Sequence, residues 1–190
     1  MTALSLTSSL KDDILVVGLA HSPSQRKDGK PMLVIESGDL LLDAKGLEEI
    51  LKDMGATGKA DEVIKIPGNT VRLLIFTGLG KASSTYGHEL LRRAAGAASR
   101  TLSNHKSATF ALPARDLQEV SAVAQGAALG AYLFNEFRSD EAVTSNSSLA
   151  AAKIYTPHAT KVDFKDAVEE AAIIARYTFL TRDLINTPPS

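Results

Sequence analysis

The apolar run from Ile14 to Ala20 (ILVVGLA) constrains the fold more than any other segment of the chain. A short continuous run of this kind, without alternating polar side chains, is typical of a strand that is buried on both faces. A sheet containing such a strand must be covered on both sides, and helices usually supply the cover. The run therefore predicts an α/β domain.

The other patterns predict one three-layer domain with a mixed sheet of about six strands, flanked by four main helices. Five further strands are expected at Met32–Glu36, Glu62–Pro67, Val71–Thr77, Ser107–Ala114 and Leu149–Thr156. The pair on either side of Gly68 and Asn69 has a hairpin-type turn signal, so at least one pair of strands should be antiparallel. The polar segments His21–Lys30 and Asp140–Ser148 are expected to be loops.

The first three helices are predicted from apolar periodicity and from end signals. Asp43 can cap the first helix and Gly55 can end it, with an inward stripe of Leu47, Ile50, Leu51 and Met54. The second is expected at Ser84–His105. The third is expected at Asp116–Ser139, with its apolar face extending to Phe134, and its Gly126 and Gly130 should let a neighbouring backbone come close.

The last predicted helix, Asp163–Asn186, carries two apolar stripes rather than one. Asp163 is expected to cap it. One stripe contains Val168, Ala172, Ala175 and Phe179, and the other contains Ile173, Tyr177, Leu180 and Leu184. A helix with two stripes is usually buried between two bodies, so this helix should pack on its own domain and offer a second face to a partner.

Composition excludes several functional classes. The 190 residues contain 21 Lys and Arg against 22 Asp and Glu, a formal net charge of -1, so no global field attracts nucleic acid or an anionic membrane. The chain has no cysteine, which excludes disulfides and Cys-ligated metal sites and suits a cytoplasmic protein. No apolar run approaches the roughly 20 residues that span a bilayer, and no signal peptide is recognised.

Motifs for catalysis are missing from the sequence. The four histidines, His21, His88, His105 and His158, are far apart and have no i, i+4 partner. There is no Gly-x-Ser-x-Gly elbow, Walker loop or complete Gly-x-Gly-x-x-Gly. We therefore predict no catalytic residue, no metal ligand and no cofactor in this chain.

One partial ligand signal is the turn Thr77-Gly78-Leu79-Gly80-Lys81, between a strand and the helix that follows. Gly78 and Gly80 could expose backbone N–H groups to a phosphate beside a helix N-terminus. The simpler interpretation is that the two glycines only allow a tight turn.

Two further sets of charged residues have structural interpretations. Arg92, Arg93 and Arg100 could form a basic face for DNA, but no aromatic residues interleave them and a solvated helix face is favoured. The pairs Asp12-Asp13 and Glu169-Glu170 are adjacent in sequence, so their side chains diverge and should be solvated.

The end of the chain carries a family resemblance. RDLINTPPS, from Arg182 to Ser190, resembles the segment Arg-Asp-Leu-x-Asn-x-Pro-Pro that joins the two domains of leucyl (cytosol) aminopeptidases, which are two-metal exopeptidases. The stretches LLIFTGLGK, LRRAAGAASRTL and QGAALGAYLFNEFRS are similar to the N-terminal domain of that family, in the same order.

The resemblance implies a domain organisation and a function. Residues 1–187 would be the macro-domain-like N-terminal domain, with 163–187 as a connecting helix, and residues 188–190 would begin a catalytic domain that this sequence does not contain. The full-length protein would be a cytoplasmic, homohexameric enzyme that releases N-terminal amino acids from peptides with two divalent metal ions, manganese or zinc. Its metal ligands and catalytic residues would all lie in the catalytic domain, which would be the first partner of this chain.

Two alternatives remain open. The chain could be a free-standing macro-like domain that binds ADP-ribose or a related nucleotide through Gly78 and Gly80. It could also be a DNA-binding accessory domain that uses Arg92, Arg93 and Arg100, although the charge balance disfavours nucleic acid.

Overall fold

The structure is a computed structural model that describes residues 2–25, 31–36, 44–68, 71–135 and 147–188. Its centre is a seven-stranded sheet in the order β1-β7-β6-β2-β5-β4, with β3 also paired to β2. The strands are β1 (Ala3–Thr7), β2 (Ile14–Gln25), β3 (Pro31–Glu36), β4 (Val63–Pro67), β5 (Leu73–Lys81), β6 (Ser107–Ala111) and β7 (Ala151–Tyr155). Neighbours are parallel from β1 to β5, whereas β4 and β3 are antiparallel to β5 and β2. The expected mixed α/β sheet is confirmed.

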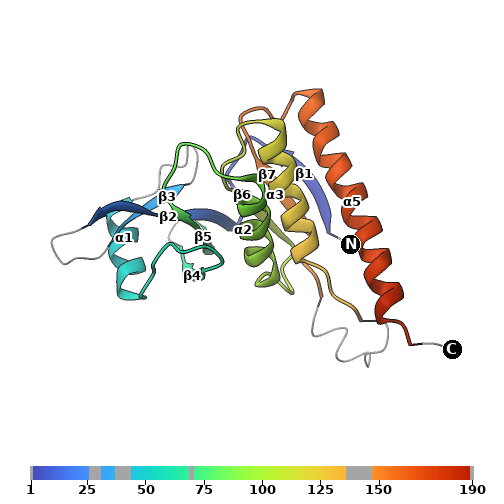
Figure 1. The fold of residues 1–190 in the computed structure, drawn as a ribbon, viewed down its shortest axis with the longest axis horizontal. Helices are drawn as coiled ribbons and strands as arrows, with labels where there is room; N and C mark the ends of the chain where they lie inside the picture. The colour runs from blue at the N-terminus through green and yellow to red at the C-terminus, as the bar shows by residue number, and fades with distance from the viewer. Residues whose placement is uncertain (1, 26–30, 37–43, 69–70, 136–146, 189–190) are drawn as a thin grey trace.

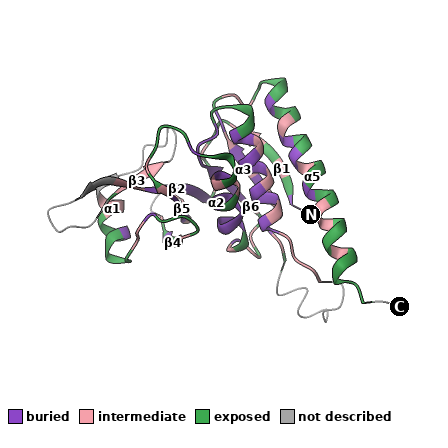
Figure 2. Ribbon diagram, in the orientation of Figure 1, coloured by how far each residue is buried: buried purple, intermediate pink, exposed green. Residues whose placement is uncertain are grey.

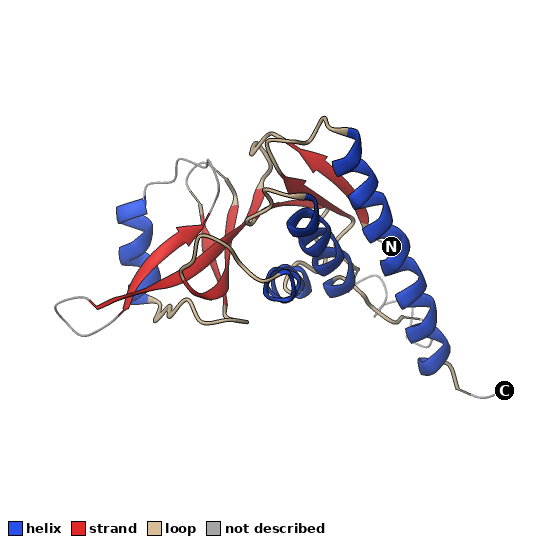
Figure 3. Ribbon diagram, turned by 45° about the horizontal axis from the view of Figure 1, so that its top comes forward, coloured by secondary structure: helices blue, strands red, loops and turns tan. Residues whose placement is uncertain are grey.

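Helices cover both faces of the sheet. The described helices are α1 (Ala44–Asp53), α2 (His88–Arg100), α3 (Leu117–Gly130) and α5 (Val162–Asn186). Figure 1 shows α2, α3 and α5 side by side, with α1 beside β3 at the other end of the sheet. Helix α2 packs on β5 and β2, α3 packs on β7 and β1, and α5 packs on β1. In the turned view, the C-terminal part of α5 extends past α2 and α3 (Figure 3).

Alternate residues of β2 enter two different cores. Ile14 and Val16 lie in the larger core with α2, α3 and the first half of α5. Leu15 and Val17 lie in the smaller core on the opposite face, where Leu51 of α1 is fully buried. Because both sets are buried, the Ile14–Ala20 run belongs to a doubly covered strand, as its sequence predicts.

Two glycines of α3 bring its backbone against that of α2. A Cβ atom at Gly126 would lie 2.1 Å from the carbonyl oxygen of Arg92, and one at Gly130 would lie 2.3 Å from that of Gly96. Ser99 of α2 also donates a hydrogen bond of 2.6 Å to the carbonyl of Ala127. The close approach expected from the glycine spacing is confirmed.

Several boundaries differ from the sequence prediction. Strand β1 was not expected. Strand β2 continues through His21 to Gln25, part of a predicted loop, because its second half pairs with β3. Helix α3 ends at Gly130 instead of Ser139, and the half-buried Phe134 lies beyond it. The N-cap of α5 is Lys161 instead of Asp163, and its side chain makes no capping hydrogen bond.

In α1 only part of the expected stripe faces the sheet. Leu51 is buried and Leu47 is half-buried, but Ile50 and Met54 are exposed, so the stripe is narrower than predicted. Gly55 has a φ of 77° and ends the helix as expected. The predicted cap Asp43, turn residue Asn69, loop residues 140–146 and chain end 189–190 lie outside the described residues.

Candidate functional site

The second apolar stripe of α5 is exposed to solvent. On the inward side Phe164, Val168, Ala171 and Ala175 are buried, while Ala172 and Phe179 are half-buried. The outward stripe, which we call the α5 surface, consists of Ile173, Tyr177, Leu180 and Leu184, whose exposed fractions are 50%, 62%, 52% and 69%. In Figure 2, much of the C-terminal half of α5 is coloured as exposed. Leaving each such side chain in water forgoes roughly 1.5 to 3 kcal/mol of burial, so this surface suits a protein partner.

The end of α5 is held by Tyr132, which follows α3. The Tyr132 hydroxyl donates a hydrogen bond of 2.7 Å to Oδ1 of Asp183 and accepts one of 3.2 Å from Nδ2 of Asn186. Its ring lies 5.0 Å from the ring of Phe179, and the guanidinium of Arg182 lies 3.8 Å from its centroid. Burial and the hydrogen bond to Asp183 raise the pKa of Tyr132 above its ordinary value. The phenol therefore remains neutral, and its single proton can be donated to Asp183.

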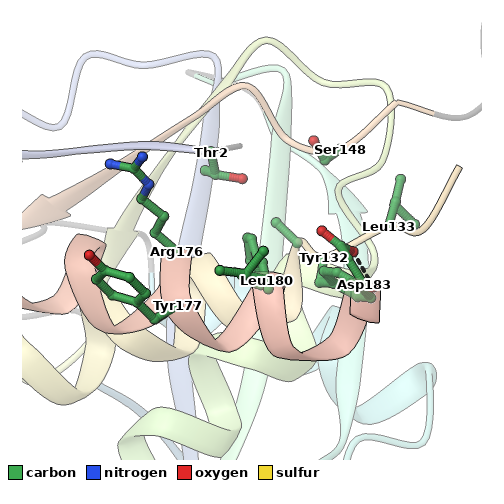
Figure 4. A pocket seen from close by; sticks show the side chains of 10 residues that line it. Thr2, Tyr132, Leu133, Ser148, Arg176, Tyr177, Leu180 and Asp183 are labelled. Atoms are coloured by element: carbon green, nitrogen blue, oxygen red, sulfur yellow. Dashed lines mark hydrogen bonds between the residues drawn. The ribbon is translucent and has the colours of Figure 1, made fainter. Parts of the chain in front are cut away.

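A groove of about 430 Å³ runs between α5 and this anchor. Figure 4 shows Arg176, Tyr177 and Leu180 on the helix side and Thr2, Leu133 and Ser148 on the opposite side, with the Tyr132–Asp183 bond at one end. The apolar walls and scattered polar groups suit an apolar side chain of a partner protein. The groove and the α5 surface share Tyr177 and Leu180, so they form one continuous site.

The predicted ligand turn lies inside a strand. Gly78 and Gly80 are both in β5, where their backbone N–H groups donate hydrogen bonds of 2.8 Å to the carbonyls of Glu62 and Gly58. A Cβ atom at Gly78 would lie 1.6 Å from the carbonyl oxygen of Lys59, and Gly80 has a φ of 73°. Both glycines therefore have a structural role in packing the 58–62 segment against β5. Phosphate binding there stays a prediction, and this geometry does not favour it.

The four histidines lie in four different places. Nδ1 of His21 is 3.4 Å from the carbonyl oxygen of Gly58, and His88 begins α2. Nδ1 of His105 is 3.4 Å from Nη2 of Arg72, and the ring of His158 lies 5.0 Å from that of Phe164, tilted by 55°. Within the ranges that the structure describes, no three His, Asp or Glu side chains are grouped closely enough to hold a metal ion.

One of the predicted solvated carboxylates has partners. Oδ1 of Asp12 accepts a hydrogen bond of 2.8 Å from Nζ of Lys153, and its other oxygen accepts from the Thr109 hydroxyl. Burial alone would raise the pKa of Asp12, but these hydrogen bonds and the Lys153 charge outweigh it and hold the pKa below its ordinary value. The expectation of solvation holds for the exposed Glu169 and Glu170 and is wrong for Asp12.

Residue periodicity did not identify the Tyr132 anchor. The sequence pattern predicts Tyr132 inside a helix, but that helix ends before it, and no pattern connects Tyr132 with Asp183, 51 residues later. A signal was nevertheless present, because Tyr132 lies in QGAALGAYLFNEFRS and Arg182, Asp183 and Asn186 lie in RDLINTPPS. The segments that carry the family resemblance are therefore the ones that meet at this site.

Hydropathy gives no sign of a membrane segment in the described part of the chain. None of its helices combines the length and the apolar character that crossing a bilayer requires.

Comparison with known sequences identifies relatives over the whole chain. The family model described as "Cytosol aminopeptidase family, N-terminal domain" matches residues 29–141. A probable cytosol aminopeptidase of Streptomyces avermitilis is 37% identical over 210 residues, which cover 100% of this chain and 40% of that protein. One of Rhodococcus opacus is 35% identical over 198 residues, covering 99% of this chain and 37% of the relative. The chain thus spans about two fifths of the length of these curated relatives.

Solved structures share the fold. A mutant of tomato leucine aminopeptidase superposes on 99% of this chain with a TM-score of 0.67 and 20% identity, over 39% of its own length. The bottromycin maturation enzyme BotP superposes on 93% of this chain with a TM-score of 0.64 and 24% identity, over 33% of its own length. At these identities the structural likeness concerns the fold alone.

Proposed function

Because the chain belongs to the cytosol aminopeptidase family, we propose that it is the non-catalytic N-terminal domain of a metal-dependent leucyl aminopeptidase. The full-length enzyme would be a hydrolase that releases N-terminal amino acids from peptides. The observation that carries this proposal is the match of residues 29–141 to the model of the family's N-terminal domain. Relatives at 33% to 37% identity that are called probable cytosol aminopeptidases support the activity.

The metal chemistry would be supplied by the catalytic domain. One structural neighbour is BotP in complex with Mn, which supports divalent metals, manganese or zinc, in the full-length enzyme. The described residues of this chain do not fit such a site, because they contain no group of three metal-ligating carboxylates or histidines. No catalytic step is therefore assigned to residues of this chain.

The role of this domain would be assembly. The α5 surface supplies four large exposed apolar side chains on one helix face, and the catalytic domain would cover them in the complete protein. The resemblance to leucyl aminopeptidases supports a homohexamer, and the name of the family supports a cytoplasmic location. The ADP-ribose alternative has less support, because the N–H groups of Gly78 and Gly80 already donate within the fold. The DNA alternative has less support, because the formal net charge of -1 gives no overall attraction to nucleic acid.

An activity measurement tests the non-catalytic assignment. The purified 190-residue chain should not hydrolyse leucine p-nitroanilide with or without added manganese or zinc, whereas the Streptomyces avermitilis relative should do so under the same conditions. Turnover that persists through repurification and stops when a chelator is added would contradict the proposal.

The encoding gene tests the domain assignment independently. The reading frame should continue beyond Ser190 into a region with clustered Asp, Glu and Lys, as the share of the relatives that the chain covers leads us to expect. A stop codon directly after Ser190 would refute the aminopeptidase proposal.

A further inference from the structure

A second hollow, of about 410 Å³, lies over the contact between α2 and α3 and is surrounded by guanidinium groups. Arg92, Arg93 and Arg100 of α2 line it together with Arg182 of α5, and Asp61 is the carboxylate in the lining. We call it the arginine hollow. Four cations against one anion make it locally basic, although the whole chain has a formal net charge of -1.

The helix geometry arranges these cations around a common space. Arg93 and Arg100 are seven residues apart, so they share one face of α2 and are separated by about 10 Å along the axis. Gly96 lies between them on the same face and places no side chain in the gap. Arg182 arrives from α5, where its guanidinium lies 3.8 Å from the Tyr132 ring centroid.

Packing between the helices does not require the glycine at position 96. A Cβ atom there would lie 3.4 Å from the carbonyl oxygen of Gly126 and 3.7 Å from Nη1 of Arg100, which are ordinary contacts. Gly126 and Gly130 differ, since their added Cβ atoms would overlap backbone atoms of α2. A glycine inside a helix lowers its stability by about 1 kcal/mol relative to alanine. Gly96 therefore leaves the hollow open at a cost in helix stability that packing between the helices does not require.

The ion pairs of the arginines can be exchanged for contacts with a ligand, while Nε of Arg92 keeps its hydrogen bond of 3.0 Å to Gln125. Arg93 pairs with Asp61 and Arg92 pairs with Glu89, and Glu89, Arg93 and Asp61 have substantially exposed side chains. Exposed ion pairs of this kind contribute only about 0 to 1 kcal/mol. Arg100 makes no ion pair with any residue in the described ranges. One guanidinium group can donate two parallel, strong hydrogen bonds to the oxygens of a phosphate.

We propose that the arginine hollow binds a small anion of the phosphate or polyphosphate class. The ligand places its charged oxygens between Arg93 and Arg100, where Gly96 leaves room, and Arg92 and Arg182 bind it from either side. Asp61 weakens this binding, because its carboxylate repels the ligand and competes for Arg93. The site is separate from the proposed aminopeptidase role and stands without it.

Calorimetric titration of the 190-residue chain with tripolyphosphate and with inorganic phosphate tests the proposal. Arg100→Gln should weaken tripolyphosphate binding about threefold to tenfold, because it removes a guanidinium donor. Asp61→Asn should tighten it about threefold. Asparagine tolerates the φ of 67° at this position, so this variant should keep the fold.

Two matched variants control for general charge effects. Arg176→Gln and Glu169→Gln change the same charges on exposed positions of α5 that do not line the hollow, and both should leave the affinity unchanged. Thermal unfolding of each variant confirms that it is folded. Equal effects of the Arg176 and Arg100 changes would overturn the proposal, as would the absence of binding to the unmodified chain at millimolar tripolyphosphate.

A DNA titration separates a small anion from a nucleic-acid backbone. A short duplex should bind more weakly than tripolyphosphate at both about 50 mM and about 200 mM salt. Tighter binding of the duplex, lost steeply with salt and with Arg100→Gln, would assign the arginines to nucleic acid and would refute the proposal of a small-anion site.

Discussion

Replacing Gly126 with alanine should separate two helices that now touch through their backbones. The added Cβ atom would lie 2.1 Å from the carbonyl oxygen of Arg92 and 2.9 Å from Cβ of Ala95. The first distance is more than about 1 Å shorter than ordinary van der Waals contact. Neither the carbonyl nor Cβ can move by side-chain rotation, so α2 and α3 must shift apart.

Two opposing effects set the change in unfolding free energy caused by Gly126→Ala. Overpacking a rigid site typically costs about 1 to 3 kcal/mol, and this site belongs at the upper end because the overlap is with backbone. Alanine regains about 1 kcal/mol of helix propensity over glycine. The net expectation for Gly126→Ala is a loss of about 2 kcal/mol, which lowers Tm by about 4 to 8 °C for a chain of this size.

Gly96→Ala is the matched control on the facing helix. Its Cβ atom would be 3.4 Å from the carbonyl oxygen of Gly126, an ordinary contact, so the gain in helix propensity should dominate the change in stability. This variant should gain up to about 1 kcal/mol. Urea and thermal unfolding, followed by circular dichroism, measure both changes. Equal stability changes in the two variants, or a more stable Gly126→Ala protein, would refute the inference that backbone contact at Gly126 sets the helix spacing.

Two other predictions concern single hydroxyl and carboxylate groups. Tyr132→Phe removes both hydrogen bonds to the end of α5, so amide exchange across Leu180–Asn186 should accelerate about fivefold to tenfold, while residues 164–175 remain unchanged; uniform exchange in both halves would contradict the anchoring role of Tyr132. Asp12→Asn should destabilise the fold by about 1 kcal/mol at about pH 7. Because the pKa of Asp12 is lowered in the folded state, its ionised carboxylate stabilises the fold above the unfolded pKa, and this stabilisation is lost as the pH falls through the folded pKa. The difference in unfolding free energy between Asp12→Asn and the unmodified chain, measured by urea titration, should therefore shrink toward about pH 2.5. A difference that stays constant with pH would refute the assignment.

Features encoded within one segment were predictable from sequence. The Ile14–Ala20 run is buried on both faces, and the outward stripe of α5 is exposed as its second periodicity indicates. The glycine pair of α3 meets α2 at backbone distance. In each case, the signal is a spacing of side chains within a single element, which the helix or strand period converts directly into a face.

Features that depend on distant partners were not predictable. Strand β1 is short and partly polar, and it is a strand because it pairs with β7. The second half of β2 has polar residues that look like a loop, yet β3 provides an antiparallel partner. Helix α3 ends at Gly130, and Tyr132 beyond it binds α5. Long-range pairing overrides local propensity at each of these points.

The same family resemblance that defines the domain also indicated where its candidate site lies. Tyr132 and Asp183 belong to two resembling segments, and their hydroxyl and carboxylate meet at 2.7 Å. The arginine hollow could be predicted only in part from the sequence. Arg92, Arg93 and Arg100 share one helix, whereas Arg182 is brought to them by the fold.

The parallel pairing of β1 with β7 has a consequence for synthesis on the ribosome. Residue 3 pairs with residue 151, so β7 emerges from the ribosome about 150 residues after β1. At about 5 to 20 residues per second, β1 waits about 7 to 30 s for the strand that covers its edge. The domain therefore completes its sheet only after translation of most of these 190 residues, and β1 remains without its β7 partner during that interval.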